Sequence, residues 1–159
     1  MRDTIRLQRA RHLIGLQSRT KNADETKAST GRIGQLWKRF VHEDVAGHVP
    51  NKVPDASVIA VYSDYESDMN GEYSLTVGCE VNALEEIPSG MTGVTIVPAT
   101  YAVFPVAGSD PSAIVEAWMR VWSEFSGTPT SQRAYTTDFE EYRFGPAGAR
   151  TVTIYISLT

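Results

Sequence analysis

Hydrophobic and polar positions predict strands and helices in an order that occurs twice along the chain. In the first half, residues 12–16 predict a strand, and apolar side chains at helical spacing over 33–40 predict an amphipathic helix after the capping pair Ser29-Thr30. Two strands with β-branched and aromatic residues follow, at 58–65 and 73–81. The first half therefore predicts a β-α-β-β unit.

The second half repeats this order, with Asp110 as the N-cap of its helix and Pro111 in the first turn. The predicted elements are a strand at 101–104, a helical stripe over 114–125 that ends at Gly127 and Pro129, and strands at 135–143 and 152–158 around a turn at 145–148. A second β-α-β-β unit is therefore expected.

Two such units bury more apolar surface when they dock about a pseudo-twofold axis, and a cleft is then left along that axis. The fold class predicted is α+β, an antiparallel sheet with two main helices and a central cleft. We expect one domain over 1–159, with an internal repeat at about 10–82 and 98–159. The segments 64–66 and 138–140 align between the halves, and 41–51 has room for a short extra helix.

Composition and charge narrow the function. The chain has 159 residues, of which 42% are hydrophobic, and its net charge of −4 argues against a duplex-DNA binder, which needs clustered basic residues. No apolar run reaches the roughly 18 residues of a membrane helix, and the charged first ten residues do not resemble a secretory signal. The single cysteine, Cys79, excludes an internal disulfide and fits a reducing cytoplasm. We expect a cytoplasmic protein.

Several short motifs occur in an order and spacing that span nearly the whole chain. They are Leu13-Ile14-Gly15-Leu16, Ile33-Gly34-x-Leu36-Trp37-x-x-Phe40, Val61-Tyr62-x-Asp64-Tyr65-Glu66, Gly71-Glu72-Tyr73 and Asp138-Phe139-Glu140-x-Tyr142. Together they resemble the GyrI-like, or AraC-type effector-binding, small-molecule-binding domains, above all the stand-alone integron-cassette members. The resemblance implies tandem β-α-β-β modules around a cleft that binds amphipathic, often cationic, aromatic compounds.

The resemblance also implies that Glu140 is the acidic centre of the cleft, with Tyr142 beside it. Strand alternation places Asp138, Glu140 and Tyr142 on one face and Glu141 on the other, but a second adjacent carboxylate leaves open which of the two points inward. A carboxylate among aromatic rings attracts an organic cation, and cation–π contacts add roughly 0.5–2 kcal/mol. A solvated glutamate on the outer face of the sheet is the alternative.

Four further aromatic residues are candidates for the wall of a ligand site: Trp118, Trp37, Tyr101 and Tyr62. Trp37 matches Trp122 across the repeat, and both are expected mainly in the core. Trp118 has no tryptophan counterpart in the first helix, so it is the stronger candidate. Tyr101 and Tyr62, at strand ends, are weaker ones.

The expected function is binding of a small amphipathic, cationic aromatic ligand, in a drug-binding or regulatory role that follows from the resemblance. Two alternatives are a hydrolase of strained, cyclopropane-type electrophiles, in which Glu140 activates water and Tyr142 assists, and a protein inhibitor of DNA gyrase that acts through 64–72. A homodimer or a regulatory protein partner is left open.

No metal or cofactor is expected, because the histidines and Cys79 lack ligand spacing and no phosphate-binding glycine loop occurs.

Overall fold

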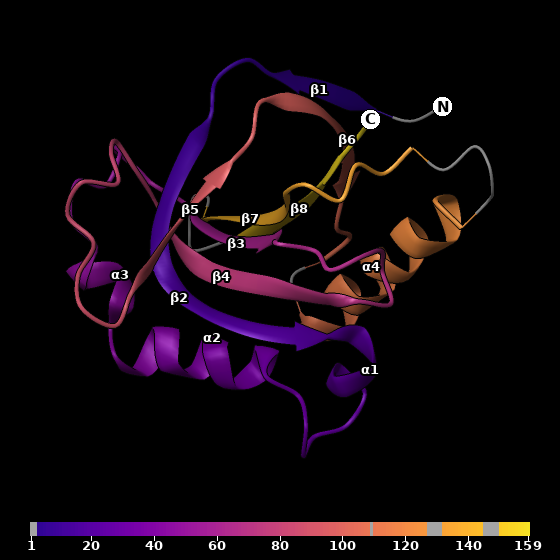
Figure 1. Ribbon diagram of the computed structural model, residues 1–159, viewed down its shortest axis with the longest axis horizontal. Helices are drawn as coiled ribbons and strands as arrows, with labels where there is room; N and C mark the ends of the chain where they lie inside the picture. Colours follow the sequence, from indigo (N-terminus) through magenta and orange to yellow (C-terminus); the bar gives the residue numbers. More distant parts are fainter. Residues whose placement is uncertain (1–2, 109, 127–131, 145–149) are drawn as a thin grey trace.

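The strands form one curved antiparallel sheet, with helices on one of its faces (Figure 1). The computed structural model describes residues 3–108, 110–126, 132–144 and 150–159. The strands are β1 (Thr4–Leu7), β2 (Arg11–Lys21), β3 (Val58–Ser63), β4 (Glu72–Val81), β5 (Thr92–Ile96), β6 (Ala99–Pro105), β7 (Asp138–Phe144) and β8 (Arg150–Ser157). The helices are α1 (Asn22–Glu25), α2 (Ile33–His42), α3 (Val45–His48) and α4 (Pro111–Glu124).

The strand order of the sheet reveals two related halves. The order is β1-β6-β8-β7-β3-β4-β2-β5. Counted from the outside of the sheet toward its middle, the first half runs β2, β4, β3 and the second half runs β6, β8, β7, which are the equivalent strands of the two units. The halves meet where β3 pairs with β7 in antiparallel register. Because a twofold axis between two antiparallel strands exchanges them, this pairing confirms the predicted pair of β-α-β-β modules.

Two short strands that the sequence pattern does not predict extend the repeat. β1 precedes the first module but pairs with β6 of the second, and β5 precedes the second module but pairs with β2 of the first. Each module therefore covers the strand that would otherwise be the other's exposed edge. The two modules are interlocked by exchanged strands as well as by their packing.

The expected alignment of 64–66 with 138–140 is wrong. β3 ends at Ser63, so Asp64 and the two residues after it lie beyond the strand, whereas Asp138 begins β7. In the register of the sheet, Tyr62 is opposite Asp138 and Ala60 is opposite Glu140. The similarity of the two short segments is local and does not mark equivalent positions.

The two main helices begin in different ways. The Asp110 side chain accepts a hydrogen bond from the Ala113 N–H at 2.9 Å, which confirms it as the N-cap of α4. The prediction that Ser29-Thr30 caps α2 is wrong, because α2 begins only at Ile33 and the Glu25 carboxylate accepts from the N–H groups of Arg32 and Ile33, at 2.8 and 3.1 Å. The cap of α2 therefore comes from the preceding helix.

Other local predictions have mixed outcomes. The short helix expected in 41–51 is α3. Gly127, Pro129 and the turn at 145–148 lie outside the described residues. In the described part of the chain, no helix has the length and apolar character needed to cross a membrane.

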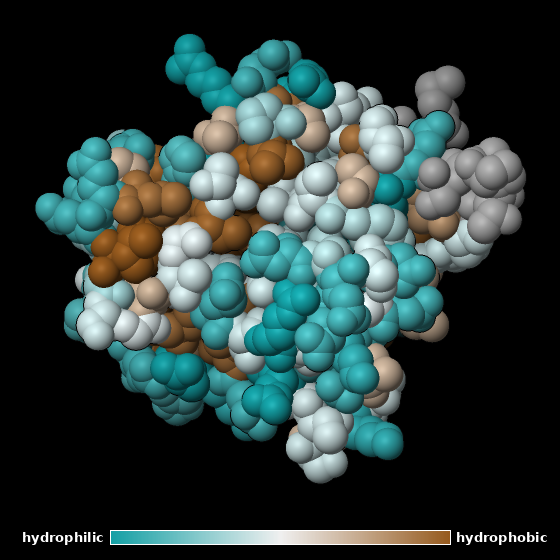
Figure 2. Space-filling model, in the orientation of Figure 1, coloured by the Kyte–Doolittle hydropathy of each residue, from teal (hydrophilic) through white to brown (hydrophobic). Residues whose placement is uncertain are grey.

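Apolar residues form a large cluster on the helix-covered face of the sheet and a small one on the other face. The large cluster joins Leu36 and Phe40 of α2 to Trp118 and Val121 of α4. The small cluster contains Leu13, Ile59, Val61, Ile96, Tyr101 and Phe139. Figure 2 shows a largely polar surface, on which apolar side chains gather beside α3 and β5.

Strands β2 and β4 lie close together where Gly15 is opposite Gly78. A Cβ atom on Gly15 would lie 2.0 Å from the Val77 carbonyl oxygen and 2.5 Å from the Gly78 Cα. We expect Gly15→Ala to lower the free energy of unfolding by about 1–3 kcal/mol in urea denaturation. Gly34→Ala in α2, where a Cβ meets nothing within 4 Å, should raise it by about 0.5–1 kcal/mol. Equal effects of the two changes would contradict the close approach.

Candidate functional site

A pocket of about 780 Å³ opens on the helix-covered face of the sheet, between α2 and α4. Both modules contribute to it, as the predicted central cleft requires. Its aromatic lining residues are Trp37, Tyr62, Tyr65, Tyr73, Trp118, Trp122 and Tyr142. Its charged lining residues are Glu25, Arg133, Glu140 and Arg150. Val115 and Met119 of α4 also line it and are 56% and 58% exposed, so the pocket is open to solvent beside α4.

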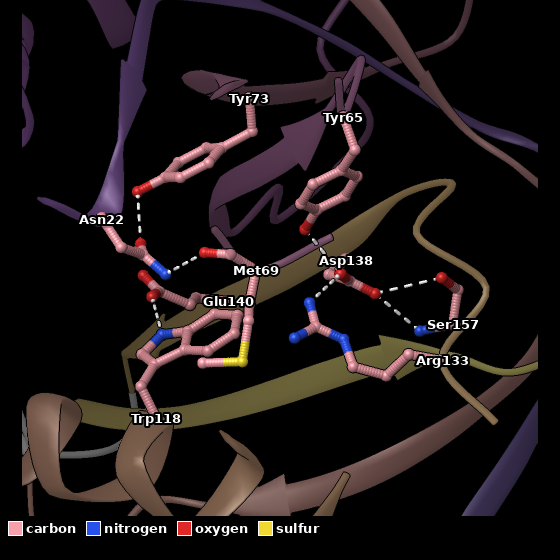
Figure 3. Close-up of polar contacts among 9 residues, drawn as sticks. All are labelled: Asn22, Tyr65, Met69, Tyr73, Trp118, Arg133, Asp138, Glu140 and Ser157. Atoms are coloured by element: carbon pink, nitrogen blue, oxygen red, sulfur yellow. Dashed lines mark hydrogen bonds and ion pairs between the residues drawn. The ribbon is translucent and has the colours of Figure 1, made fainter. Parts of the chain in front are cut away.

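The carboxylate of Glu140 accepts three hydrogen bonds in this pocket. Its Oε2 accepts from the Tyr62 hydroxyl at 2.8 Å and from the Trp118 indole N–H at 2.6 Å, and its Oε1 accepts from the Tyr142 hydroxyl at 2.6 Å. Glu140 is 3% exposed. Figure 3 shows Trp118 reaching up from α4 to this carboxylate. Side chains from β3, α4 and β7 therefore hold one acid.

Burial raises the pKa of Glu140, although the hydrogen bonds from Tyr142, Trp118 and Tyr62 oppose this effect. The pKa values of the Tyr62 and Tyr142 hydroxyls are also raised, first by burial and then by the nearby negative charge of Glu140. Both hydroxyls therefore stay protonated and act as donors. Within the described residues, no ion pair involves Glu140.

Glu141 points to the opposite face of the sheet. Its Oε2 accepts from the Ser57 hydroxyl at 2.6 Å and pairs with Arg11 at 2.9 Å and Arg143 at 3.1 Å. Burial alone would raise the pKa of Glu141, but the contacts with Ser57 and the arginines lower it below its usual range. The open question is thus settled: Glu140 faces the pocket, and it is not a solvated residue on an outer face.

The predicted aromatic walls divide into two groups. Trp37 lies edge-on to Tyr142, with ring centroids 4.9 Å apart, and Trp118 lies edge-on to Tyr62 at 5.0 Å. All four line the pocket. Tyr101 does not: it lies on the other face of the sheet, fully buried, and its hydroxyl donates to the Val97 carbonyl at 2.6 Å. Its selection as a wall residue is therefore wrong, because its position in β6 directs it away from the helices.

A second polar network, which the sequence analysis missed, lies beside Glu140. Asp138 is wholly buried, and its Oδ2 accepts from the Tyr65 hydroxyl at 2.5 Å and pairs with Arg133 at 2.8 Å (Figure 3). Its Oδ1 accepts from the N–H and the hydroxyl of Ser157. The shared strand face of Asp138 and Glu140 indicates that Asp138 points inward. Arg133 lies outside any helix or named strand, so no periodicity could have found it.

The described residues contain no group of three or more His, Cys, Asp or Glu side chains that could hold a metal ion. Cys79 is buried in β4, and burial raises the pKa of its thiol. A thiol with a raised pKa is a poor nucleophile and a poor metal ligand. The chemistry of the pocket thus rests on the carboxylates of Glu140 and Glu25, on Arg150 and the Arg133–Asp138 pair, and on a set of aromatic rings.

Comparison with known proteins shows the family to which the chain belongs. The Cass2 family model, described as integron-associated effector binding protein, matches residues 5–158. The chain belongs to this family. It is 27% identical to an integron cassette protein of Vibrio cholerae, VCH_CASS2, whose crystal structure superposes with a TM-score of 0.79 over 99% of this chain and 95% of that one. The resemblance inferred from the motifs is confirmed.

Two further similarities extend the comparison. YobU of Bacillus subtilis (strain 168), whose name suggests a role as a transcriptional regulator, is 29% identical over 151 residues, which are 93% of this chain and 92% of YobU. The structure of SAV2435 bound to tetraphenylphosphonium shares the fold, with a TM-score of 0.77 and 16% identity over 100% of this chain and 94% of that one.

We expect Glu140→Gln to increase stability at neutral pH. A raised pKa means that the ionised carboxylate is disfavoured in the folded protein, and an amide removes that cost. The amide oxygen can accept from Tyr62 and Trp118, and its NH₂ can donate to the Tyr142 hydroxyl. Thermal unfolding at pH 8 should show a Tm increase of a few degrees, since about 1 kcal/mol corresponds to about 2–4 °C at this size. The gain should shrink as the pH falls through the pKa of Glu140.

Glu141→Gln is the matched control. Because the pKa of Glu141 is lowered, its ionised form contributes stability above the ordinary pKa of glutamate, and that contribution is lost as the pH falls. This variant should therefore be less stable than the wild type at pH 8. Stability changes of the same sign in the two variants would contradict the assigned environments.

Proposed function

We propose that the protein binds a small amphipathic, cationic aromatic ligand in this pocket, with Glu140 as the counter-charge. One observation carries the proposal: a buried carboxylate lines an aromatic pocket, and the ion pairs of the described residues do not include it. Burying a charge is unfavourable unless it is paired or hydrogen-bonded. A cationic ligand supplies the missing positive charge.

The shape and chemistry of the pocket favour an organic cation over an inorganic one. A small hydrated ion would have to exchange its water shell for a single carboxylate, since no metal-binding cluster occurs in the described residues. Aromatic walls such as Trp37 and Trp118 instead bury flat apolar groups and attract a delocalised or tetrahedral organic charge through their ring faces. Charge and apolar area together then set the selectivity.

The two arginines of the pocket do not prevent binding of a cation. Arg133 is paired with Asp138, so their charges offset each other. Arg150 is exposed, and water screens its charge. The Arg150 guanidinium lies 5.8 Å from the centroid of the Tyr142 ring, whereas the hydroxyls of Tyr62 and Tyr142 and the indole N–H of Trp118 all donate directly to Glu140.

The comparisons support this ligand class. SAV2435, which shares the fold, has been solved with tetraphenylphosphonium, a quaternary phosphonium cation with four phenyl groups. The family description, effector binding, and the regulatory role in the name of YobU support a regulatory use of the bound ligand.

Hydrolysis of a strained electrophile is a second candidate, favoured by one observation. Burial raises the pKa of Glu140, which brings it closer to that of a general base at neutral pH, and Tyr142 stays protonated beside it as a proton donor. Consumption of a cyclopropane-containing electrophile, followed by chromatography, would favour the hydrolase. Binding without consumption of ligand favours the effector-binding protein.

Binding of tetraphenylphosphonium should depend on Glu140. We expect Glu140→Gln to weaken binding at least about thirtyfold, which corresponds to about 2 kcal/mol, because the cation loses the buried carboxylate that is its counter-charge. Glu141→Gln, one residue away on the opposite face, should bind within twofold of the wild type. Isothermal titration calorimetry, with tryptophan fluorescence as a second signal, measures both. Equal affinities of the wild type and Glu140→Gln would remove Glu140 from the site.

The affinity for the cation should also depend on pH. Only the ionised form of Glu140 attracts the ligand, so binding should weaken as the pH falls through its raised pKa, about tenfold for each further pH unit. The decrease should begin at a higher pH than it would for an ordinary glutamate, whose pKa is 4.5. The residual affinity of Glu140→Gln should show no such decrease. Wild-type binding that does not change with pH across the folded range would argue against the proposal.

A further inference from the structure

A second charged group in the pocket has hydrogen-bond donors that the protein does not use. Arg133 is 7% exposed and lines the pocket. In the described part of the chain its side chain donates only through Nη2, to Asp138 at 2.8 Å. Its Nε is buried without a hydrogen-bond partner. A buried donor without an acceptor is unfavourable, so the site is incomplete at this point.

The position of Arg133 is fixed by its surroundings. Asp138 also accepts from the Tyr65 hydroxyl and twice from Ser157, so the carboxylate cannot turn to serve further donors of the guanidinium. The guanidinium also lies over the Tyr135 ring, 4.3 Å from its centroid. The remaining donors therefore need an acceptor that comes from outside this network.

Arg133 and Glu140 line the same pocket. Asp138 and Glu140 are two residues apart on one face of β7, which separates them by roughly 6.6 Å along the strand. Arg133 donates a hydrogen bond to Asp138, and Trp118 donates one to Glu140. In Figure 3 the guanidinium end of Arg133 points toward the half of the view that holds Glu140 and Trp118. One small molecule can span both.

We propose that the ligand carries an uncharged oxygen acceptor, such as a carbonyl group, that binds Arg133, in addition to the cationic group at Glu140. This rests on the proposed function and narrows its ligand class. A neutral acceptor fits better than a carboxylate, because Asp138 already balances the charge of Arg133. A carboxylate would also be repelled by both Asp138 and Glu140.

A matched set of phosphonium probes tests this. Hexyltriphenylphosphonium and (5-oxohexyl)triphenylphosphonium differ by one carbonyl group, and (4-carboxybutyl)triphenylphosphonium places a carboxylate at the same distance. In an apolar pocket without the Arg133 donors, the carbonyl would weaken binding because it loses its hydration. We expect the ketone to bind the wild type about tenfold more tightly than the hexyl probe, and the acid to bind more weakly than the ketone, in calorimetric titrations at pH 8.

Variants assign the effect to Arg133. Arg133→Lys keeps a positive charge beside Asp138 but replaces the planar guanidinium by one ammonium group, which must serve both Asp138 and the ketone, so the preference for the ketone should fall below about twofold. The double variant Arg133→Met with Asp138→Asn removes both charges of that ion pair and should bind the hexyl probe more tightly than the ketone. Arg120→Gln, on α4 outside the pocket lining, is the control and should keep the tenfold preference.

The outcomes separate the two proposals. If the wild type binds neither tetraphenylphosphonium nor the hexyl probe, the proposed function fails. If it binds the hexyl probe as tightly as the ketone, or binds the acid most tightly, the acceptor site is overturned while the cation site stands. Loss of the preference in Arg150→Gln but not in Arg133→Lys would also overturn the assignment to Arg133.

Discussion

A carboxylate buried beneath aromatic rings is stable only while enough donors hold it, and Glu140 has three. They come from β3, α4 and β7, so the acid is satisfied only when the two modules have docked. An unsatisfied buried carboxylate would take up a proton or draw in water. The pocket, its charge and the docking of the modules are therefore parts of one arrangement.

The symmetry of the fold explains why the pocket and Glu140 lie between the two modules. The departures from symmetry explain why the pocket has one such buried acid and not two. The β3–β7 pairing brings the modules together, and Glu140 sits on this seam. Opposite it in the register stands Ala60, whose methyl group adds no second charge. The exchanged strands β1 and β5 close the outer edges of both modules and leave the helix-covered face open between α2 and α4.

Periodicity in the sequence was enough to predict the modules and the orientation of one strand. Alternation along β7 puts Asp138, Glu140 and Tyr142 on one face, and the structure confirms it. It could not show that the α2 cap comes from Glu25, because that contact depends on a turn between two helices. β1 has only four residues, too few for its alternation of polar and apolar side chains to stand out in the sequence. Tyr101 was misplaced because the pattern of β6 does not reveal which of its faces meets the helices.

The pKa of Glu140 tests most directly whether this buried carboxylate is the counter-charge of a bound cation. Carbon-13 NMR of the labelled side-chain carboxyl can follow it in the free protein and in the protein saturated with tetraphenylphosphonium. We expect a pKa above that of ordinary glutamate in the free protein and a marked decrease on binding, because a cation that prefers the ionised acid must lower its pKa. A pKa that is the same with and without the bound cation would contradict this role of Glu140.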